Sequence, residues 1–283
     1  LRILELEKNL GYTGGNNRGI EIARGEYVCL LNDDTRAAPG WVEELLRVMS
    51  PRERCGLAAS KILSYYDHEV IDNVGHVIYR DGTFRGRGRL EKDRGQYDRV
   101  EEILSPSGCA MMLRKTALDE AGGFDEDFYI YGDDAELSLR LRLAGWEAWT
   151  APAAVVYHKY SASTGAYSPL KAFLVERNRV WLTVKYFPPG ALALSPFFLL
   201  WRLLFQAYGV LAGKGAAAEF SKTNPAWRLP VLLARAQLSA LKGLPKTWKK
   251  RRRLRPLRRV PSAEFYRWLR DYGMSARELA LKP

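Results

Sequence analysis

The first part of the chain alternates short strand-like runs with helical patterns. Residues 1–7 place apolar and charged side chains in turn, which predicts a half-buried strand, and 27–31 form a continuous apolar run, typical of a strand covered on both faces. Pro39 then opens a helical pattern that continues to Met49. The succession of strand, acidic turn and helix predicts an α/β sheet.

The same order continues up to residue 186. A glycine- and asparagine-rich loop over 9–19 should lead into a short helix at 20–24, and a polar loop is expected over 158–168. Gly108 lies inside a strand-like run, where glycine often marks close approach of another backbone or of a ligand. Further strands are expected at 57–63, 70–79, 103–113 and 146–157, and further helices at 133–144 and 170–186.

The pattern changes after the two prolines at 188 and 189. Residues 191–201 are almost wholly apolar, but Arg202 and Gln206 interrupt the run. A membrane-spanning helix needs about 20 apolar residues and a central arginine is costly, so we expect an interfacial or re-entrant amphipathic helix instead. A second amphipathic helix is expected at 229–244. We therefore predict an α/β domain over 1–187 and a helical C-terminal region over 188–283.

The formal net charge of +12 conceals an uneven distribution. Residues 1–184 hold 24 Lys and Arg against 28 Asp and Glu, whereas 185–283 hold 20 against four. Ten of these cations lie between 242 and 259, which predicts contact with an anionic membrane surface, with a plain solvated charge run as the alternative. Nucleic acid is not an expected partner, because the main domain is acidic and the basic segment lacks interleaved aromatic side chains.

The three cysteines do not form a metal site or a disulfide framework by spacing. Cys29, Cys55 and Cys109 are far apart in the sequence, and this usage is typical of a reducing compartment. Because Cys29 and Cys109 lie in apolar runs, both are expected to be buried thiols.

An acidic turn, Asn32-Asp33-Asp34, follows the apolar strand at 27–31. In open α/β sheets ligands bind beyond the carboxyl ends of the strands, and one or two carboxylates together with substrate phosphates commonly hold Mg²⁺ or Mn²⁺. A structural Asx turn that caps the next helix is the alternative for these residues.

A second acidic group begins the helix expected at 133–144. Asp133 and Glu136 have the spacing of a capping box, and Glu136 should pair with Arg140 on the helix surface. Asp134 remains without such a role. A carboxylate in the first turn of a helix lies in a positive field, which keeps it ionised and able to accept a proton.

His158 follows the strand expected at 146–157 and opens a polar loop, a setting that suits a metal ligand or a phosphate contact. His68 and His76 have no such setting and are expected to be structural. The glycine-rich loop at 9–19 would let a backbone approach a ligand closely, but it matches neither a Walker loop nor a dinucleotide-binding motif.

Taken in order, these motifs closely resemble those of the family 2 glycosyltransferases with a GT-A fold. Bacterial rhamnosyltransferase-type members, which build cell-wall and surface polysaccharides, look the most similar. The resemblance spans about residues 3–187, and its matching strings are 9–20, 30–35, 122–126 and 132–137, with His158, Ser161, Ser163 and 177–179 at further positions.

The resemblance implies a role for each matched residue. Asp134 stands at the position of the general base, with Asp133 beside it as a second catalytic candidate. The metal motif comprises Asn32, Asp33, Asp34 and His158, with Asp34 as the most direct ligand. The implied donor-binding residues are Gly14, Gly15, Asn17, Asp33 and Arg177, and the implied acceptor-binding residues are Gly108, Cys109, Ala110 and Asp134.

The resemblance therefore implies an inverting, Mg²⁺- or Mn²⁺-dependent transfer of a sugar from a nucleoside-diphosphate sugar to a glycan or a polyprenyl-diphosphate-linked acceptor. Such an enzyme would act at the cytoplasmic face of the cell membrane. The family's domain starts with a strand–helix–strand unit ahead of the Leu1 position, so the chain is expected to be an N-terminally truncated GT-A domain with a basic helical extension. A non-catalytic membrane-associated remnant or scaffold is the alternative.

Overall fold

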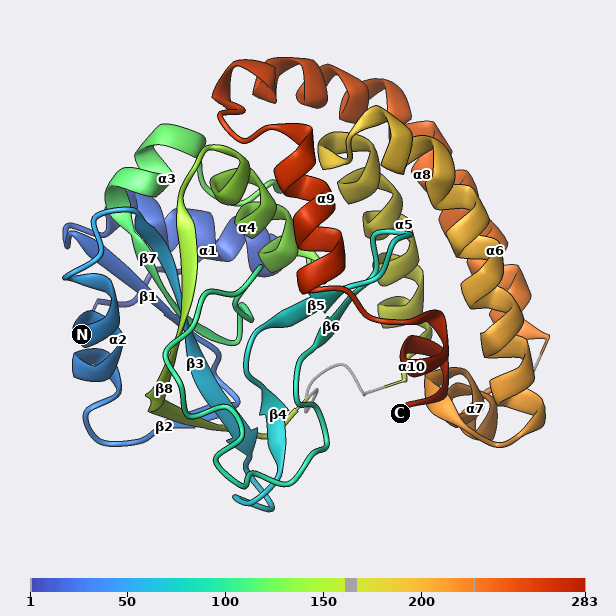
Figure 1. Cartoon of the computed structure of the whole chain (residues 1–283), viewed down its shortest axis with the longest axis horizontal. Coiled ribbons are helices and arrows are strands. Elements are labelled where there is room, and N and C mark those ends of the chain that lie inside the picture. The colour runs from blue at the N-terminus through green and yellow to red at the C-terminus, as the bar shows by residue number, and fades with distance from the viewer. Residues whose placement is uncertain (1, 161–166, 226, 283) are drawn as a thin grey trace. The chain divides into compact units, whose positions relative to one another are not determined.

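The computed structural model describes residues 2–160, 167–225 and 227–282 (Figure 1). They form two compact units. The first comprises Leu1–His76, Gly86–Tyr160 and Leu257–Val260, and the second comprises Val77–Arg85, Ser161–Pro256 and Pro261–Pro283. The predicted boundary after residue 187 falls inside the second unit and stays a prediction.

A mixed sheet forms the centre of the first unit. Its strands lie in the order β1-β7-β3-β8-β2, with β4 paired to β3, and only the β3–β8 pair is parallel. This arrangement confirms the predicted α/β class. The strands are β1 (Tyr27–Leu31), β2 (Thr35–Ala37), β3 (Cys55–Ser64), β4 (Ile71–Asn73), β7 (Ala110–Arg114) and β8 (Glu147–His158), and the separate pair is β5 (His76–Ile78) and β6 (Phe84–Gly86).

Helices cover both faces of this sheet. Side chains alternate along β7, so that Met111 joins one hydrophobic cluster and Met112 the other. Helix α2 (Trp41–Met49) packs in the cluster with Met112, whereas α1 (Gly11–Ile22), α3 (Lys115–Ala121) and α4 (Asp133–Leu143) pack in the cluster with Met111. Because helices cover both faces, β3 is buried almost throughout its length.

Two predictions at the start of the chain are wrong. Residues 2–10 form no strand, and the side chains of Ile3 and Leu4 are 76% and 45% exposed, because alternation makes a strand only where a neighbouring strand pairs with it. The glycine- and asparagine-rich segment is the helix α1 rather than a loop. Tertiary contacts stabilise this helix: the Thr13 amide donates to the Tyr129 carbonyl at 3.1 Å, and the Tyr12 hydroxyl donates to the Gly108 carbonyl at 2.6 Å.

Three further predictions need correction in detail. β1 is an edge strand with one face exposed, so Cys29 is exposed rather than buried, whereas Cys109 is buried as predicted. The strand expected at 70–79 is split into β4 and β5 at Gly75, whose φ of +108° breaks an extended chain. The strand expected at 103–113 is regular only from Ala110, within β7.

The second unit is helical. α8 continues through the basic cluster that follows the predicted helix, because lysine and arginine are good helix formers. It packs against α5, where the Trp181 indole donates to the Ala240 carbonyl at 3.0 Å. The helices are α5 (Pro169–Tyr186), α6 (Pro189–Leu211), α7 (Gly215–Thr223), α8 (Arg228–Leu254), α9 (Ser262–Asp271) and α10 (Ala276–Leu281).

A buried ion cluster holds α6 in this unit. Arg202, in the middle of α6, is 2% exposed and donates from Nε to the Asp81 carboxylate at 2.7 Å. Its two terminal nitrogens, Nη1 and Nη2, form ion pairs with the two carboxylate oxygens of Glu176 on α5, at 2.8 and 2.9 Å. Burial alone would raise the pKa of Glu176, but the guanidiniums of Arg202 and Arg179 lower it to about 2. The cluster therefore stays charged at neutral pH.

Substituting Glu176→Gln should destabilise the chain by about 3–5 kcal/mol, because two buried guanidiniums lose one of their two carboxylate partners and share only Asp81. Since the folded-state pKa of Glu176 is depressed, its contribution is complete above the unfolded value of about 4.3 and is lost as pH falls toward 2. Urea unfolding as a function of pH measures both effects. Glu219→Gln, which breaks only a solvent-accessible pair with Lys222, is the control and should cost about 1 kcal/mol at most. A similarly small cost for Glu176→Gln would show that the cluster does not stabilise the fold.

Candidate active site

The acidic turn extends from the end of β1, as predicted. The Asn32 amide donates to the Cys109 carbonyl at 2.9 Å, which continues the ladder beyond the Leu31–Ala110 pair. On the other side of the turn, β2 pairs with β8 so that Thr35 lies opposite His158. This register places the Asp34 carboxylate beside the His158 ring.

Asp34 and His158 form one corner of the site. The Asp34 Oδ1 atom lies 3.3 Å from His158 Nε2, and this buried oxygen has no hydrogen-bond partner. His158 Nδ1 lies 2.6 Å from the Asp72 carboxylate, to which it donates, so in the neutral ring the Nε2 lone pair is directed at Asp34. A carboxylate oxygen and an imidazole nitrogen this close need a proton or a metal cation between them. The corner therefore fits a divalent metal ion.

These two side chains would supply only part of a coordination shell. Within residues 2–160, 167–225 and 227–282, no group of three or more His, Cys, Asp or Glu side chains is placed to hold a metal ion. Mg²⁺ and Mn²⁺ commonly take their remaining ligands from water and substrate phosphates. Asp33 is exposed in the turn and the Asn32 side chain is partly buried; their predicted roles at the metal stay predictions.

Asp72 holds the His158 ring in place, a role that no local sequence pattern indicates. Its second oxygen accepts from Arg89 at 3.0 Å, and both side chains are largely buried, with 12% and 14% exposed. A carboxylate behind a metal-binding histidine fixes the tautomer and raises the basicity of the other ring nitrogen.

Substituting Asp72→Asn should weaken Mn²⁺ binding by about 10–100-fold, because the amide keeps the shape but loses the charge that polarises His158. Titration calorimetry of Mn²⁺ in the presence of a nucleoside diphosphate measures this. The melting temperature is followed in parallel, and Asp119→Asn on α3, an exposed carboxylate paired only with Lys115, is the control. Unchanged Mn²⁺ affinity in the Asp72 variant would contradict the positioning role.

Asp134 forms the second corner, at the first turn of α4. Its Oδ2 accepts from the Gly108 amide at 3.0 Å and its Oδ1 from the Ala135 amide at 2.8 Å. The Tyr12 hydroxyl donates to the Gly108 carbonyl at 2.6 Å, and a Cβ at position 108 would lie 2.7 Å from that hydroxyl. Another group does approach Gly108 closely, but it is the Tyr12 side chain and not the backbone or ligand that was predicted.

His76 also lies at this corner, although the sequence favoured a purely structural role for it. Its Nε2 lies 3.8 Å from Asp134 Oδ2, and its Nδ1 lies 3.1 Å from the Ser105 hydroxyl. Ser105 donates its own proton to the Pro106 carbonyl, so it can accept from His76 Nδ1. No sequence signal identifies His76, because only the fold brings it near Asp134.

Asp133 and Glu136, the other two acidic residues in the first turn of α4, are both buried. The predicted capping box does not form, since Gly132 is the N-cap and no side chain bonds there. Glu136 pairs with Arg140 at 2.9 Å as predicted, but the pair is buried rather than on the surface, and Arg140 also binds the carbonyls of residues 121–123. Burial and the Asp134 carboxylate raise the pKa of Asp133 well above its ordinary value.

The two corners lie against the same short segment, residues 108 and 109. The Asn32 amide of the acidic turn donates to the Cys109 carbonyl at 2.9 Å, and the Gly108 amide donates to Asp134 at 3.0 Å. Burial raises the pKa of the Cys109 thiol well above its ordinary value, and the carboxylates of Asp72, Asp34 and Asp134 raise it further. The acidic turn and the start of α4, a hundred residues apart in sequence, are therefore neighbours in the fold.

The remaining predicted residues have contacts of their own. Gly14 and Gly15 are inside α1, and both ends of the Asn17 amide bond to the Phe124 main chain, at 2.8 and 2.9 Å, which favours a structural role for Asn17. Arg177 lies on α5 of the second unit, with its guanidinium 4.4 Å from the Trp181 ring centre. Ser161 and Ser163 lie outside the described residues. The donor-binding roles of these residues stay predictions.

Comparison with a solved structure supports the fold. The crystal structure of GalNAc-T7 with UDP, GalNAc and Mn²⁺ superposes with a TM-score of 0.50 at 15% identity, over 65% of this chain and 37% of that one. The likeness agrees with the GT-A architecture, a mixed sheet flanked by helices.

The chain matches two sequence relatives over very different fractions of their length. Uncharacterized protein y4gI of Sinorhizobium fredii is 29% identical over 58% of this chain, but the match spans only 19% of that protein. N-acetylglucosaminyl-diphospho-decaprenol L-rhamnosyltransferase of Mycobacterium tuberculosis is 28% identical over 71% of this chain and 76% of its own length.

The family comparison covers both the acidic turn and α4. The model described as Glycosyl transferase family group 2 matches residues 27–236, about three quarters of the chain. The matched range includes Asp34, Asp134 and His158, the residues on which the two corners of the site depend. The chain therefore belongs to glycosyl transferase family group 2.

Proposed function

We propose that this glycosyltransferase moves a sugar from a nucleoside-diphosphate donor to an acceptor hydroxyl with inversion at the anomeric carbon, using Mg²⁺ or Mn²⁺. The observation that carries the proposal is the buried, unpartnered Oδ1 of Asp34 opposite His158 Nε2. Asp134 lies nearby, because the acidic turn bonds to Cys109 and Asp134 bonds to the adjacent Gly108. One corner suits a diphosphate with its metal ion, and the other suits an acceptor hydroxyl.

On the donor side, Asp34 and His158 would hold the metal ion, and Asp72 would keep His158 in the correct tautomer. A bound Mg²⁺ or Mn²⁺ neutralises the charge that develops on the departing diphosphate. The Mn²⁺ in the GalNAc-T7 structure is consistent with this choice of metal.

On the acceptor side, Asp134 would take the proton from the attacking hydroxyl. Two backbone amides already orient its carboxylate, so little reorganisation is needed in the transition state. The acceptor oxygen then forms the new glycosidic bond as the bond to the diphosphate breaks. Attack from the face opposite the leaving group inverts the anomeric carbon.

The acceptor we propose is a glycan on a polyprenyl diphosphate, in the assembly of cell-envelope polysaccharide. The rhamnosyltransferase relative is named for an acceptor of this kind, N-acetylglucosaminyl-diphospho-decaprenol, and matches over most of this chain. Such acceptors lie in a membrane, and the ten cations between 242 and 259 suit its anionic cytoplasmic face. Rhamnose is one candidate for the transferred sugar.

The test is a transfer assay with the full chain, Mn²⁺, a panel of nucleoside-diphosphate sugars and a short-chain N-acetylglucosaminyl-diphospho-polyprenol. We expect one donor to give a glycosylated lipid whose new linkage, measured by NMR, has the anomeric configuration opposite to that of the donor. A retained configuration would overturn the inverting mechanism. If no nucleoside diphosphate bound with Mn²⁺, the non-catalytic scaffold would become the better description.

A further inference from the structure

Helix α6 presents an apolar stripe to solvent. Every exposed residue of this 23-residue helix is apolar, and they recur every three or four positions, so they lie on one face. Several are large, with Phe197 62% and Tyr208 58% exposed. The stripe residues are Ala193, Leu194, Pro196, Phe197, Leu200, Trp201, Leu204, Ala207, Tyr208 and Leu211.

The opposite face of α6 is fixed to the second unit. Arg202 is bound to Asp81 and Glu176 in the buried ion cluster, and it is on the side opposite to the stripe. Gly209 packs so tightly that a Cβ there would lie 2.8 Å from the Lys214 carbonyl and 3.5 Å from that of Ala280. The helix therefore cannot roll to hide the stripe, and continuous apolar surface of this extent marks an interaction site.

The shape of the helix favours a bilayer surface over a membrane span. Pro189–Leu211 is long and apolar enough to cross a membrane by length and composition. Crossing would place the charged cluster around Arg202 at mid-membrane depth together with the helices packed on it, which is costly. A helix with one apolar face outward and one face packed on protein lies in the membrane interface instead.

Helix α8 of the same unit adds positive charge. It contains no acidic residue, and its exposed positions are either apolar, such as Leu238, Leu241 and Trp248, or basic. Apolar and aromatic side chains mixed with lysine and arginine are typical of helices that bind anionic lipid. The exposed cations of α8 are Arg228, Arg235, Lys242, Lys246, Lys249, Arg252 and Arg253.

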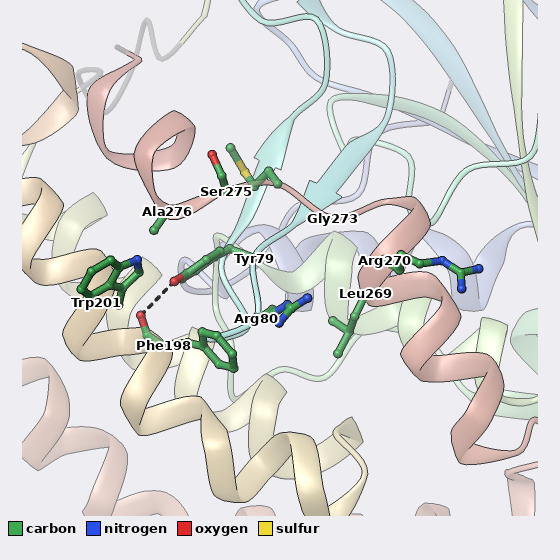
Figure 2. Close-up of a pocket in the computed structure, with 10 residues that line it drawn as sticks. Tyr79, Arg80, Phe198, Trp201, Leu269, Arg270, Gly273, Ser275 and Ala276 are labelled. Carbon is green, nitrogen blue, oxygen red and sulfur yellow. Dashed lines mark hydrogen bonds between the residues drawn. The ribbon is translucent and has the colours of Figure 1, made fainter.

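A hollow of about 380 Å³ opens beside the stripe (Figure 2). Phe198 and Trp201 of α6 form one side of it, and the Tyr79 hydroxyl donates to the Phe198 carbonyl at 3.2 Å. Arg80 lies 5.3 Å above the Phe198 ring and has no carboxylate partner among the described residues, whereas Arg270 is paired with Asp271. An exposed cation thus lies next to the apolar stripe.

We propose that the α6 stripe enters the boundary between head groups and acyl chains of an anionic phospholipid bilayer, with Arg80 and the α8 cations facing lipid phosphates. The partner is a lipid surface rather than another protein, because the 20 cations against four anions in 185–283 complement anionic head groups and repel a second copy. This proposal rests on the membrane location proposed above and deepens it by naming the inserted surface.

The test compares co-sedimentation of the full chain with vesicles of phosphatidylcholine alone and with vesicles that also contain phosphatidylglycerol. Phe197→Gln with Leu204→Gln removes two stripe side chains without changing charge, and Ala263→Gln at an exposed position of α9 is the matched control. We expect binding to the anionic vesicles only, weakened about tenfold or more in the stripe variant and unchanged in the control.

Each other outcome has a definite meaning. If the wild type binds and the stripe variant binds equally well, the basic segment suffices and the α6 inference is wrong. A wild type that binds neither vesicle overturns both the α6 inference and the membrane location. If sedimentation velocity shows a dimer that the stripe variant breaks, a second copy covers the stripe. Transfer to a water-soluble acceptor, measured separately, reports on catalysis and should be the same in all three proteins.

Discussion

Substituting Asp134→Asn should lower the turnover of sugar transfer by about 10²–10⁴-fold, the usual contribution of a positioned base. The amide keeps the size of the side chain, and its oxygen can still accept from the Gly108 amide, which Asp134 binds at 3.0 Å. The variant cannot accept the acceptor proton. Because Asp134 lies at the acceptor corner, affinity for a nucleoside diphosphate with Mn²⁺ should hardly change.

Initial rates at saturating donor measure turnover, and calorimetry with the nucleoside diphosphate measures the donor side. Asp119→Asn, an exposed carboxylate on α3, controls for loss of negative charge. If the Asp134 variant keeps near-normal turnover, the base lies elsewhere, and His76 at 3.8 Å becomes the next group to examine. If instead donor affinity falls while turnover is kept, Asp134 belongs to donor binding.

Much of the sheet could be predicted from hydrophobic pattern alone. β3, β8 and α4 lie close to their predicted positions, because residues buried on two faces form long apolar runs and the start of α4 is rich in acidic side chains. The same pattern wrongly predicted that β1 would be a central strand of the sheet. A five-residue apolar run does not distinguish a central strand from an edge strand, and only the pairing with β7 decides this.

Helix α1 could not be predicted, because the interactions that stabilise it are distant in sequence. Four glycines and two asparagines in twelve residues favour a loop by every local rule. Tyr12 nevertheless bonds to Gly108, Thr13 to Tyr129, and Asn17 to Phe124, and these contacts compensate for the low helix propensity.

Some residues of the candidate site could be predicted from local sequence, whereas others are brought there only by the fold. Asp34, Asp134 and His158 follow strands or begin a helix and match family motifs, so the sequence could indicate them. Asp72 and His76 lie in the short strands β4 and β5 without any motif, and they reach the site only because β4 pairs with β3 and the chain reverses at Gly75. Their partners, rather than their own surroundings in sequence, define their roles.

Substituting Asp34→Asn should weaken Mn²⁺-dependent binding of a nucleoside diphosphate by at least about 100-fold, more than loss of the supporting carboxylate Asp72. The Asp34 oxygen that faces His158 at 3.3 Å is buried without a hydrogen-bond partner, so its negative charge is available to a cation. The amide removes that charge and leaves His158 as the single remaining protein ligand of the pair.

Calorimetric titration of a nucleoside diphosphate, with Mn²⁺ and with EDTA in its place, separates metal-dependent affinity from the rest. In the Asp34→Asn variant, we expect the affinity for the nucleoside diphosphate measured with Mn²⁺ to fall to the affinity measured with EDTA. Asp119→Asn should leave both affinities unchanged. The melting temperature should rise in the variant or stay the same, because an unpaired buried carboxylate is costly to fold. If the Asp34 variant kept the full Mn²⁺ enhancement, the metal ion would have to bind elsewhere, and the assignment of donor and acceptor corners would have to be revised.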